Sequence, residues 1–243
     1  MYFLYCVLSS KLFYVNISEN QILERGKKLY KKGQNKKEII YMNAKKLLYE
    51  VGYTNTTIKK IAIASDVPVS LVHYYFEKKE SIVKSIYYDF VNNVDFFLYQ
   101  QKPEIFKNSI LSHTVSSRIY YDIILNNENN RRVYYEILKN KSNYSILDKY
   151  ALKIYKKYIE DNNIIITDEL LKSYVFMNFG ARRELFLNYF EGIIDLPIQE
   201  IVTIINGLMP RMLKIDQYFI DSLMIDSISI FNSLDYSKIK FLI

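Results

Sequence analysis

Glycine, proline and cysteine are scarce in this 243-residue sequence, which holds 6, 4 and 1 of them. Folds built from strands need frequent turn residues, and phosphate-cradling loops need glycine, so an all-β fold and a glycine-loop nucleotide site are both improbable. The single cysteine, Cys6, excludes an internal disulfide and a cysteine-based zinc site, and it favours a reducing cytoplasm. With only His73 and His113, a histidine-rich metal site is excluded as well. We therefore expect neither a metal nor a cofactor.

Motifs of catalysis and of membrane insertion are also missing. The sequence has neither an H-E-x-x-H pair nor a nucleophile elbow, so we do not expect an enzyme. The apolar runs within residues 1–20 fall short of the roughly 20 residues that cross a bilayer, and the basic start of a signal peptide is absent. Hydrophobic residues make up 50% of the chain, which predicts a folded protein with a substantial core.

Positive charge is concentrated in one part of the chain. The net charge is +7, and residues 27–84 alone hold 13 lysines against 5 acidic residues. A surplus within so short a segment is typical of segments that bind a polyanion, either a nucleic acid or an anionic membrane surface. On charge alone, a solvated lysine-rich face explains the pattern equally well.

The spacing of apolar residues predicts helices from Lys36 onward. Apolar residues recur there at steps of three and four, which indicates one buried helical face. Gly52 suits the end of this first helix, because glycine readily adopts the left-handed backbone that often follows a helix. Thr57 then suits the N-cap of a short second helix.

A third and a fourth helix follow after a tight turn. Asp66 tolerates the turn conformation, and Pro68 suits the first turn of a helix that runs to about Tyr75. The fourth helix begins near Lys79. Two short helices joined by a turn of a few residues, with a longer helix before them, form a helix-turn-helix pattern, and this pattern coincides with the lysine-rich segment.

The segment from Val51 to Ile82 carries several motifs in a fixed order. They are a glycine–aromatic pair, a threonine cap, an isoleucine–alanine pair, a turn that ends in valine, an aromatic cluster that ends in phenylalanine, and a lysine–glutamate pair. The residues concerned are Gly52-Tyr53, Thr57, Ile61-Ala62, Val67, His73 to Phe76, and Lys79-Glu80. In this order and spacing, the segment resembles the N-terminal domain of the TetR family of bacterial transcription regulators.

The resemblance implies an all-α protein with three parts. Residues 1–33 would form an N-terminal extension with a basic arm that continues to residue 37. Residues 34–94 would form the three-helix helix-turn-helix DNA-binding domain. Residues 95–243 would form a helical domain that binds a ligand and dimerises, with two late helices, at about 168–191 and 198–213, in the dimer interface.

The resemblance also assigns the DNA contacts. The third helix would enter the major groove with Val69, Ser70, His73 and Tyr74 toward the bases, behind Pro68, which stands where the family usually has a small hydroxyl residue. Since this helix has no arginine, specificity should depend on weaker contacts and on DNA shape. The residues expected to hold phosphates are Thr57, Lys36, Lys37, Lys59, Lys60, Lys78 and Lys79.

These expectations together predict a cytoplasmic, dimeric, sequence-specific transcription regulator. Its partners would be a pseudo-palindromic double-stranded DNA operator, a second copy of the chain and a small apolar ligand of unknown identity, with no membrane partner. A repressor that the ligand releases from DNA is the expected form. The alternative is a DNA-bound interaction or architectural factor of the same fold, which contacts a protein partner and has no small-molecule effector.

Overall fold

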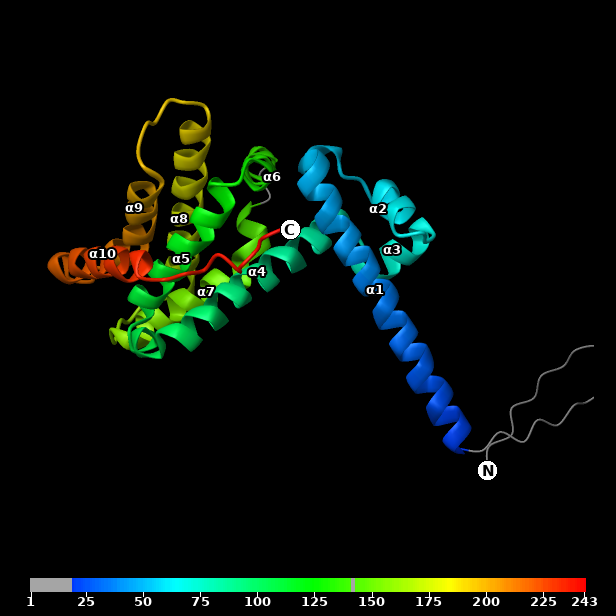
Figure 1. Ribbon diagram of the computed structural model, residues 1–243. Coiled ribbons are helices and arrows are strands. Elements are labelled where there is room, and N and C mark those ends of the chain that lie inside the picture. Colours follow the sequence, from blue (N-terminus) through cyan, green and yellow to red (C-terminus); the bar gives the residue numbers. More distant parts are fainter. Residues whose placement is uncertain (1–18, 141–142) are drawn as a thin grey trace, which may run out of the picture.

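The computed structural model describes residues 19–140 and 143–243 (Figure 1). Across these residues the chain forms ten α-helices and one short 3-10 helix, and no strand, which confirms the predicted all-α class. The helices are α1 (Glu19–Asn55), α2 (Ile58–Ala64), α3 (Val69–Phe76), α4 (Lys79–Gln101), the 3-10 helix η1 (Pro103–Lys107), α5 (Ser109–Leu125), α6 (Glu128–Lys139), α7 (Asn143–Asp161), α8 (Asp168–Phe190), α9 (Ile198–Met212) and α10 (Gln217–Asn232).

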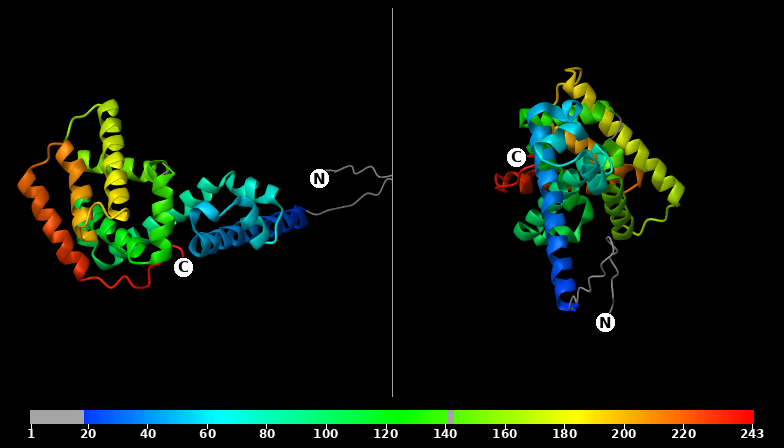
Figure 2. Two further views of the ribbon diagram at one scale, coloured as in Figure 1. Left: turned by 90° about the horizontal axis from the view of Figure 1, so that it is seen from above. Right: turned by 90° about the vertical axis from the view of Figure 1, so that its right-hand side faces the viewer.

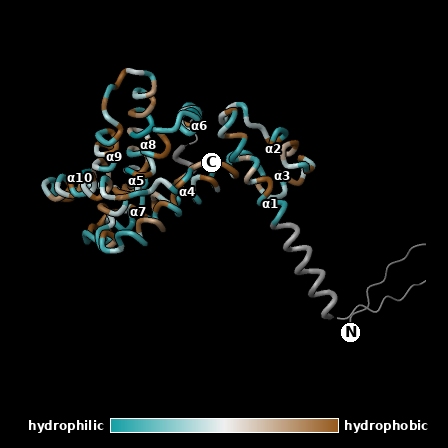
Figure 3. The backbone as a smooth tube through the Cα atoms, in the orientation of Figure 1, coloured by the Kyte–Doolittle hydropathy of each residue, from teal (hydrophilic) through white to brown (hydrophobic). Residues whose placement is uncertain are grey.

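The helices form two groups that α4 connects. In Figures 1 and 2, α1 to α3 stand apart from the bundle of α5 to α10, and α4 runs from one group into the other. The predicted boundary between residues 94 and 95 therefore lies inside α4. Hydropathy alternates along most helices, as expected where one face of each is buried (Figure 3). No helix within the described ranges is long and apolar enough to span a membrane.

The first helix is longer than the sequence suggested. The predicted basic arm of residues 24–37 is helical, because α1 already begins at Glu19, while residues 1–18 lie outside the described residues. The predicted end at Gly52 corresponds to a kink, where the backbone has φ 82° and ψ 174°. Glycine is required there, since a β-carbon would lie 2.7 Å from Oε1 of Glu136 as well as in a disfavoured backbone region.

The buried core runs through both groups of helices. The apolar residues that recur along α4 predict one buried face, and Ile82, Ile86, Phe90 and Val94 are buried there, whereas Phe97 is half-buried. Residues 233–243 then extend from α10 back to the junction of the two groups (Figure 1).

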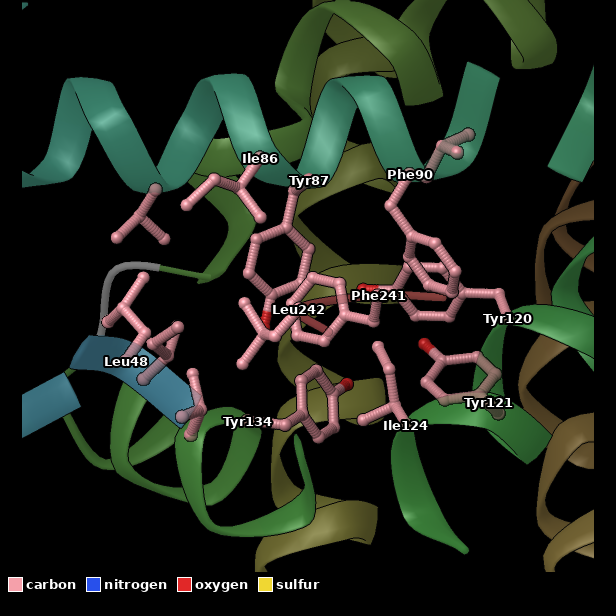
Figure 4. Close-up of a cluster of buried hydrophobic side chains, with 14 of the residues drawn as sticks. Leu48, Ile86, Tyr87, Phe90, Tyr120, Tyr121, Ile124, Tyr134, Phe241 and Leu242 are labelled. Carbon is pink, nitrogen blue, oxygen red and sulfur yellow. The ribbon is translucent and has the colours of Figure 1, made fainter. Parts of the chain in front are cut away.

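The end of this segment fills the core at the junction. Phe241 and Leu242 are only 1% and 2% exposed. The ring of Phe241 lies 4.8 Å from that of Tyr87 and 5.0 Å from that of Phe90, with Leu48 of α1 in the same cluster (Figure 4). Nothing in the sequence analysis predicted that these residues hold the two groups together.

Prolines and a side-chain cap mark breaks between the later helices. α4 ends at Gln101 before Pro103, and Pro197 is the N-cap of α9. Asn108 precedes α5, and its side chain caps this helix by accepting a hydrogen bond from the Leu111 N–H at 3.0 Å.

A buried arginine ties α5 to α9 and α10. The guanidinium of Arg118 donates to the hydroxyl oxygens of Ser227 and Thr203, and to the carbonyl oxygens of Gln199 and Met224, at 2.8–3.3 Å. It donates further to the side-chain oxygen of Gln199 at 3.1 Å. Because all of its nitrogens have acceptors, Arg118 can be fully buried without a carboxylate partner.

Candidate nucleic-acid interface

A four-residue turn sets the angle between α2 and α3. Ser65 to Pro68 connect the helices, and Asp66 has a positive φ of 50°, the left-handed conformation that the sequence predicted for it. The Val67 N–H donates to the Ala62 carbonyl oxygen at 3.1 Å. Ile61 and Val72 are fully buried between the helices, so α2 and α3 form one packed unit.

The outer face of α3 carries the residues predicted to read DNA. Val69, Ser70, His73 and Tyr74 are spaced so that they lie on one side of the helix, and all four are exposed, as is Pro68. The Tyr74 side chain is 78% exposed, and its ring meets that of Tyr75 edge-on at 5.1 Å. The structure thus brings the candidate base contacts together at one surface.

The predicted inner face of α3 is mostly in the core. Val72 and Phe76 are buried there, whereas Leu71 and Tyr75 are half-buried. This arrangement orients the outer face relative to the rest of the unit.

His73 also closes the end of α3. Its Nδ1 lies 2.5 Å from the carbonyl oxygen of Glu77, a residue held at φ 57° and ψ −57°. A carbonyl oxygen can only accept, so Nδ1 carries the proton and Nε2 is left for another partner. The sequence gave no sign of this second role, because it depends on the unusual backbone of Glu77.

The start of α2 is capped as predicted. Thr57 has extended backbone, and its side-chain oxygen accepts a hydrogen bond from the Lys60 N–H at 3.2 Å. Lys59 is exposed beside it, and Lys60 donates from Nζ to the Asn55 carbonyl oxygen at 2.8 Å. Two of the predicted phosphate-binding lysines therefore flank a helix N-terminus.

Lys79 opens α4, as predicted, and also fastens it to α1. Its Nζ donates to the carbonyl oxygen of Tyr53 at 2.8 Å and lies 3.8 Å from the centre of the Tyr53 ring. Partial burial lowers the pKa of the Lys79 ammonium below its ordinary value. The Tyr53 hydroxyl completes the cluster by donating to Glu80 at 3.1 Å.

The other predicted phosphate-binding lysines differ in exposure. Lys78, at the N-cap of α4, and Lys37 are exposed, and Nζ of Lys37 lies 5.6 Å from the centre of the Phe76 ring. Lys36 is half-buried, which makes it the least accessible of the set apart from Lys79.

Helix α6 contacts the backbone that leads into the helix-turn-helix unit. The Glu136 carboxylate accepts a hydrogen bond from the Thr54 N–H at 2.6 Å, and Arg132 donates to the Tyr49 carbonyl oxygen at 2.8 Å. These contacts join residues about 80 positions apart in the sequence, so no local pattern could have predicted them. They link the DNA-binding unit directly to the later helices.

A cavity lies within the later helices and is a second candidate site. Residues of α4, α5, α7 and α8 surround about 430 Å³, part of it open to solvent. Many of the lining residues are aromatic, with Tyr120, Tyr121, Tyr155 and Phe179 among them. Of the lining residues, Arg182 is the one whose side chain carries a permanent charge.

Comparisons with known proteins agree with this architecture. Residues 40–91 match the family described as bacterial regulatory proteins, tetR family. The solved structure of RolR in complex with the ligand resorcinol has 16% sequence identity and a TM-score of 0.54, and covers 80% of this chain and 95% of its own. RolR without ligand has 17% identity and a TM-score of 0.53, and covers 77% and 95%. No curated protein sequence matches the chain.

The family match falls inside the predicted DNA-binding domain, residues 34–94, and covers the whole α2–turn–α3 unit. The likeness to RolR, at such low identity, establishes that the later helices share a fold with a solved structure. We conclude that residues 40–91 form a helix-turn-helix DNA-binding domain of the kind described for bacterial regulatory proteins of the tetR family, and that the described residues share the fold of the RolR structures.

Proposed function

We propose that the chain is a homodimeric repressor that binds a pseudo-palindromic operator through α3 and leaves it when a small ligand binds. The exposed row of Val69, Ser70, His73 and Tyr74 is the observation that carries this proposal. Side chains of these types, on a helix that a second helix holds rigidly, are what major-groove readout requires. Such a regulator would act in the cytoplasm.

Each side chain of the row would read a different feature of the bases. Val69 can contact a thymine methyl group, and Ser70 can donate to or accept from base edges. Nε2 of His73 can accept from an exocyclic amine, because Nδ1 is already used by Glu77. Tyr74 can bond a base or a phosphate. The residues proposed to hold the phosphates on either side are Thr57, Lys36, Lys37, Lys59, Lys60, Lys78 and Lys79.

A second copy of the chain would supply the other half of the DNA contact. One α3 is short, and tight specific binding by such a unit requires two half-sites about one helical turn apart. The protein would therefore prefer an operator in which the same half-site occurs twice, in opposite orientations.

The surface best suited to this second copy lies on α8 and α10. α8 exposes Phe176 and Met177 next to Gly180, which has no atom within 4 Å of where a β-carbon would lie. α10 exposes Tyr218 and Ile225. The sequence pointed to α9 for this role, but α9 buries most of its apolar residues against α5, α8 and α10. We therefore propose α10 in its place, together with α8.

The ligand-responsive part of the proposal is supported by the cavity and by the contacts that lead from it. Arg182 in the cavity wall is followed by Arg183, whose Nε donates to the carbonyl oxygen of Leu138 in α6 at 2.9 Å. α6 in turn holds the Thr54 N–H through Glu136. A ligand that shifts α8 would thus shift α6 and the base of the reading unit, as two-state coupling requires.

A structure that shares this fold, RolR, was solved in complex with the ligand resorcinol. The open, partly polar cavity favours a small-molecule effector over the alternative of a factor that responds only to a protein partner.

Selection of duplexes from a random pool tests the DNA-binding part. We expect the purified protein to enrich an inverted repeat, and the Tyr74→Ala variant to enrich it less sharply. Recovery of random duplexes without any enrichment, or of single half-sites bound by a monomer, would contradict the proposal.

A further inference from the structure

The cavity between α4, α5, α7 and α8 contains a buried positive charge without a carboxylate partner. Nη1 of Arg182 donates to the Tyr121 hydroxyl at 3.1 Å, whereas Nε and Nη2 are buried and have no hydrogen-bond partner among the described residues. None of the ion pairs found in that part of the chain includes Arg182. Asp95, behind the wall, instead accepts hydrogen bonds from Ser116 and Tyr150 at 2.6 and 2.9 Å.

The two vacant nitrogens are the pair that a carboxylate fits. Nε–H and the neighbouring Nη2–H lie on the same edge of the planar guanidinium and point in parallel, so two oxygens of one acid group can accept both. The third nitrogen is occupied by Tyr121, which fixes the orientation of the group. Arg182 is therefore positioned with its bidentate edge unpartnered.

Arg118 offers a comparison with another buried guanidinium. Arg118 is also buried and also lacks a carboxylate, but neutral oxygens of Gln199, Thr203, Met224 and Ser227 accept from all of its nitrogens. The fold can thus satisfy a buried guanidinium completely. A buried polar group that is left without partners costs free energy, so the unpartnered edge of Arg182, which lines a cavity, is a candidate to be completed by another molecule.

The titratable groups around Arg182 are neutral at physiological pH and supply no counter-charge. Burial raises the pKa of the phenols of Tyr120, Tyr134 and Tyr155, so they remain protonated. Burial, with the charge of Arg182 as the second cause, lowers the pKa of His113 to about 3, so its imidazole is uncharged. The cavity wall itself contains no carboxylate that would balance the charge of Arg182.

The walls of the cavity determine which chemical groups a bound ligand can carry besides its acid group. The guanidinium carbon of Arg182 lies 5.9 Å from the centre of the Tyr121 ring and 5.8 Å from that of Phe179. Such flat aromatic walls favour a planar ring. Hydroxyls of Ser116 and Ser117 add a few polar contacts, and four helices enclose the space, so the occupant has to be small.

We propose that the cavity binds a small aromatic carboxylate, whose acid group accepts from Nε and Nη2 of Arg182 and whose ring lies among the aromatic walls. The inference rests on the proposed ligand-responsive function and gives the effector a chemical class. It replaces the apolar ligand expected from the sequence with an amphipathic anion.

Titration calorimetry with matched pairs of compounds tests the proposal. Benzoate, hydroxybenzoates and phenylacetate are compared with their neutral amides, which have nearly the same shape. Because hydrogen bonds to charged groups contribute about 1.5–3 kcal/mol, the best carboxylate should bind roughly tenfold to a hundredfold more tightly than its amide. Equal affinity within every pair, or binding by no carboxylate of the panel, would overturn the proposal.

Two variants locate the charge that matters. Arg182→Met should abolish the preference for the acid over the amide. Lys157→Met removes a positive charge from an exposed position on another wall helix, and should keep that preference. If the preference survives in Arg182→Met, the acid binds elsewhere and the proposal is wrong. Circular dichroism verifies that both variants fold, and the wild-type comparison decides the matter if Arg182→Met does not.

A DNA-release assay separates this inference from the proposed function. If carboxylates bind but the DNA complex persists, the chemical class is right and ligand-induced release is wrong. If only neutral aromatic compounds release DNA, release is right and the carboxylate assignment is wrong.

Discussion

Removing the side chain of Phe241 tests whether residues 233–243 hold the two groups of helices together. The ring is 1% exposed and contacts Tyr87 and Phe90 of α4. Truncation of a buried phenylalanine to alanine costs about 3–5 kcal/mol, because apolar contacts are lost and a cavity remains. For a chain of this size each kcal/mol lowers the unfolding midpoint by about 2–4 °C, so Phe241→Ala should lower it by roughly 6–20 °C.

Thermal unfolding followed by circular dichroism measures this effect at a fixed protein concentration, since the proposed dimerisation would make the midpoint depend on concentration. Ile243→Ala is the matched control in the same segment, because Ile243 is 59% exposed and its truncation should cost no more than about 0.5 kcal/mol. Equal midpoints for the two variants would refute the packing of Phe241 in the core.

Three further outcomes follow from the structure. Ile225 is 69% exposed on α10, and Ile225→Asp places a charge in the proposed interface, so this variant should be monomeric in analytical ultracentrifugation. The control Ile165→Asp, at an exposed loop position, should leave the proposed dimer intact. If Ile225→Asp is still dimeric, α10 is not part of the interface. Glu136→Gln weakens the hydrogen bond that Glu136 accepts from the Thr54 N–H. This variant should keep its ligand affinity within about twofold but release DNA less readily when ligand binds. Unaltered release would exclude coupling through α6 and Thr54. The pKa of His113 is lowered from 6.5 to about 3, so below about pH 6.5 the unfolded chain binds a proton at this residue that the folded chain does not bind. The free energy of unfolding should therefore fall with decreasing pH, by up to about 1.4 kcal/mol per pH unit. Denaturant titrations across that range should show a shallower pH dependence for His113→Asn, and an identical slope would contradict the buried, neutral imidazole.

The sequence was most informative where structure depends on local chemistry. The cap at Thr57, the turn at Asp66 and the start of α4 at Lys79 each follow from the preferences of residues close together in the chain, and all are confirmed. Apolar spacing likewise placed Val72 and Phe76 in the core.

Features that depend on distant contacts could not be read in the same way. The burial of Phe241 beside α4, and the bond from Glu136 to the Thr54 N–H, join segments that only the folded chain brings together. The unpartnered edge of Arg182 is visible only once its neighbours are placed. The apolar faces of α9 were recognised, but whether its own chain or a partner covers them cannot be inferred from periodicity. The assigned DNA contacts stay predictions.

The most direct test of the central claim is the salt dependence of binding to duplex DNA, measured by fluorescence anisotropy for the wild type, Tyr74→Ala and Lys59→Ala. We predict that Tyr74→Ala weakens binding to the preferred sequence far more than to random duplex, because we propose that its exposed ring reads bases. Lys59→Ala should weaken both alike and reduce the salt slope by about one, as loss of one phosphate contact requires. Wild-type protein that ignores duplex DNA even at low salt, or binding that neither substitution alters, would contradict the account.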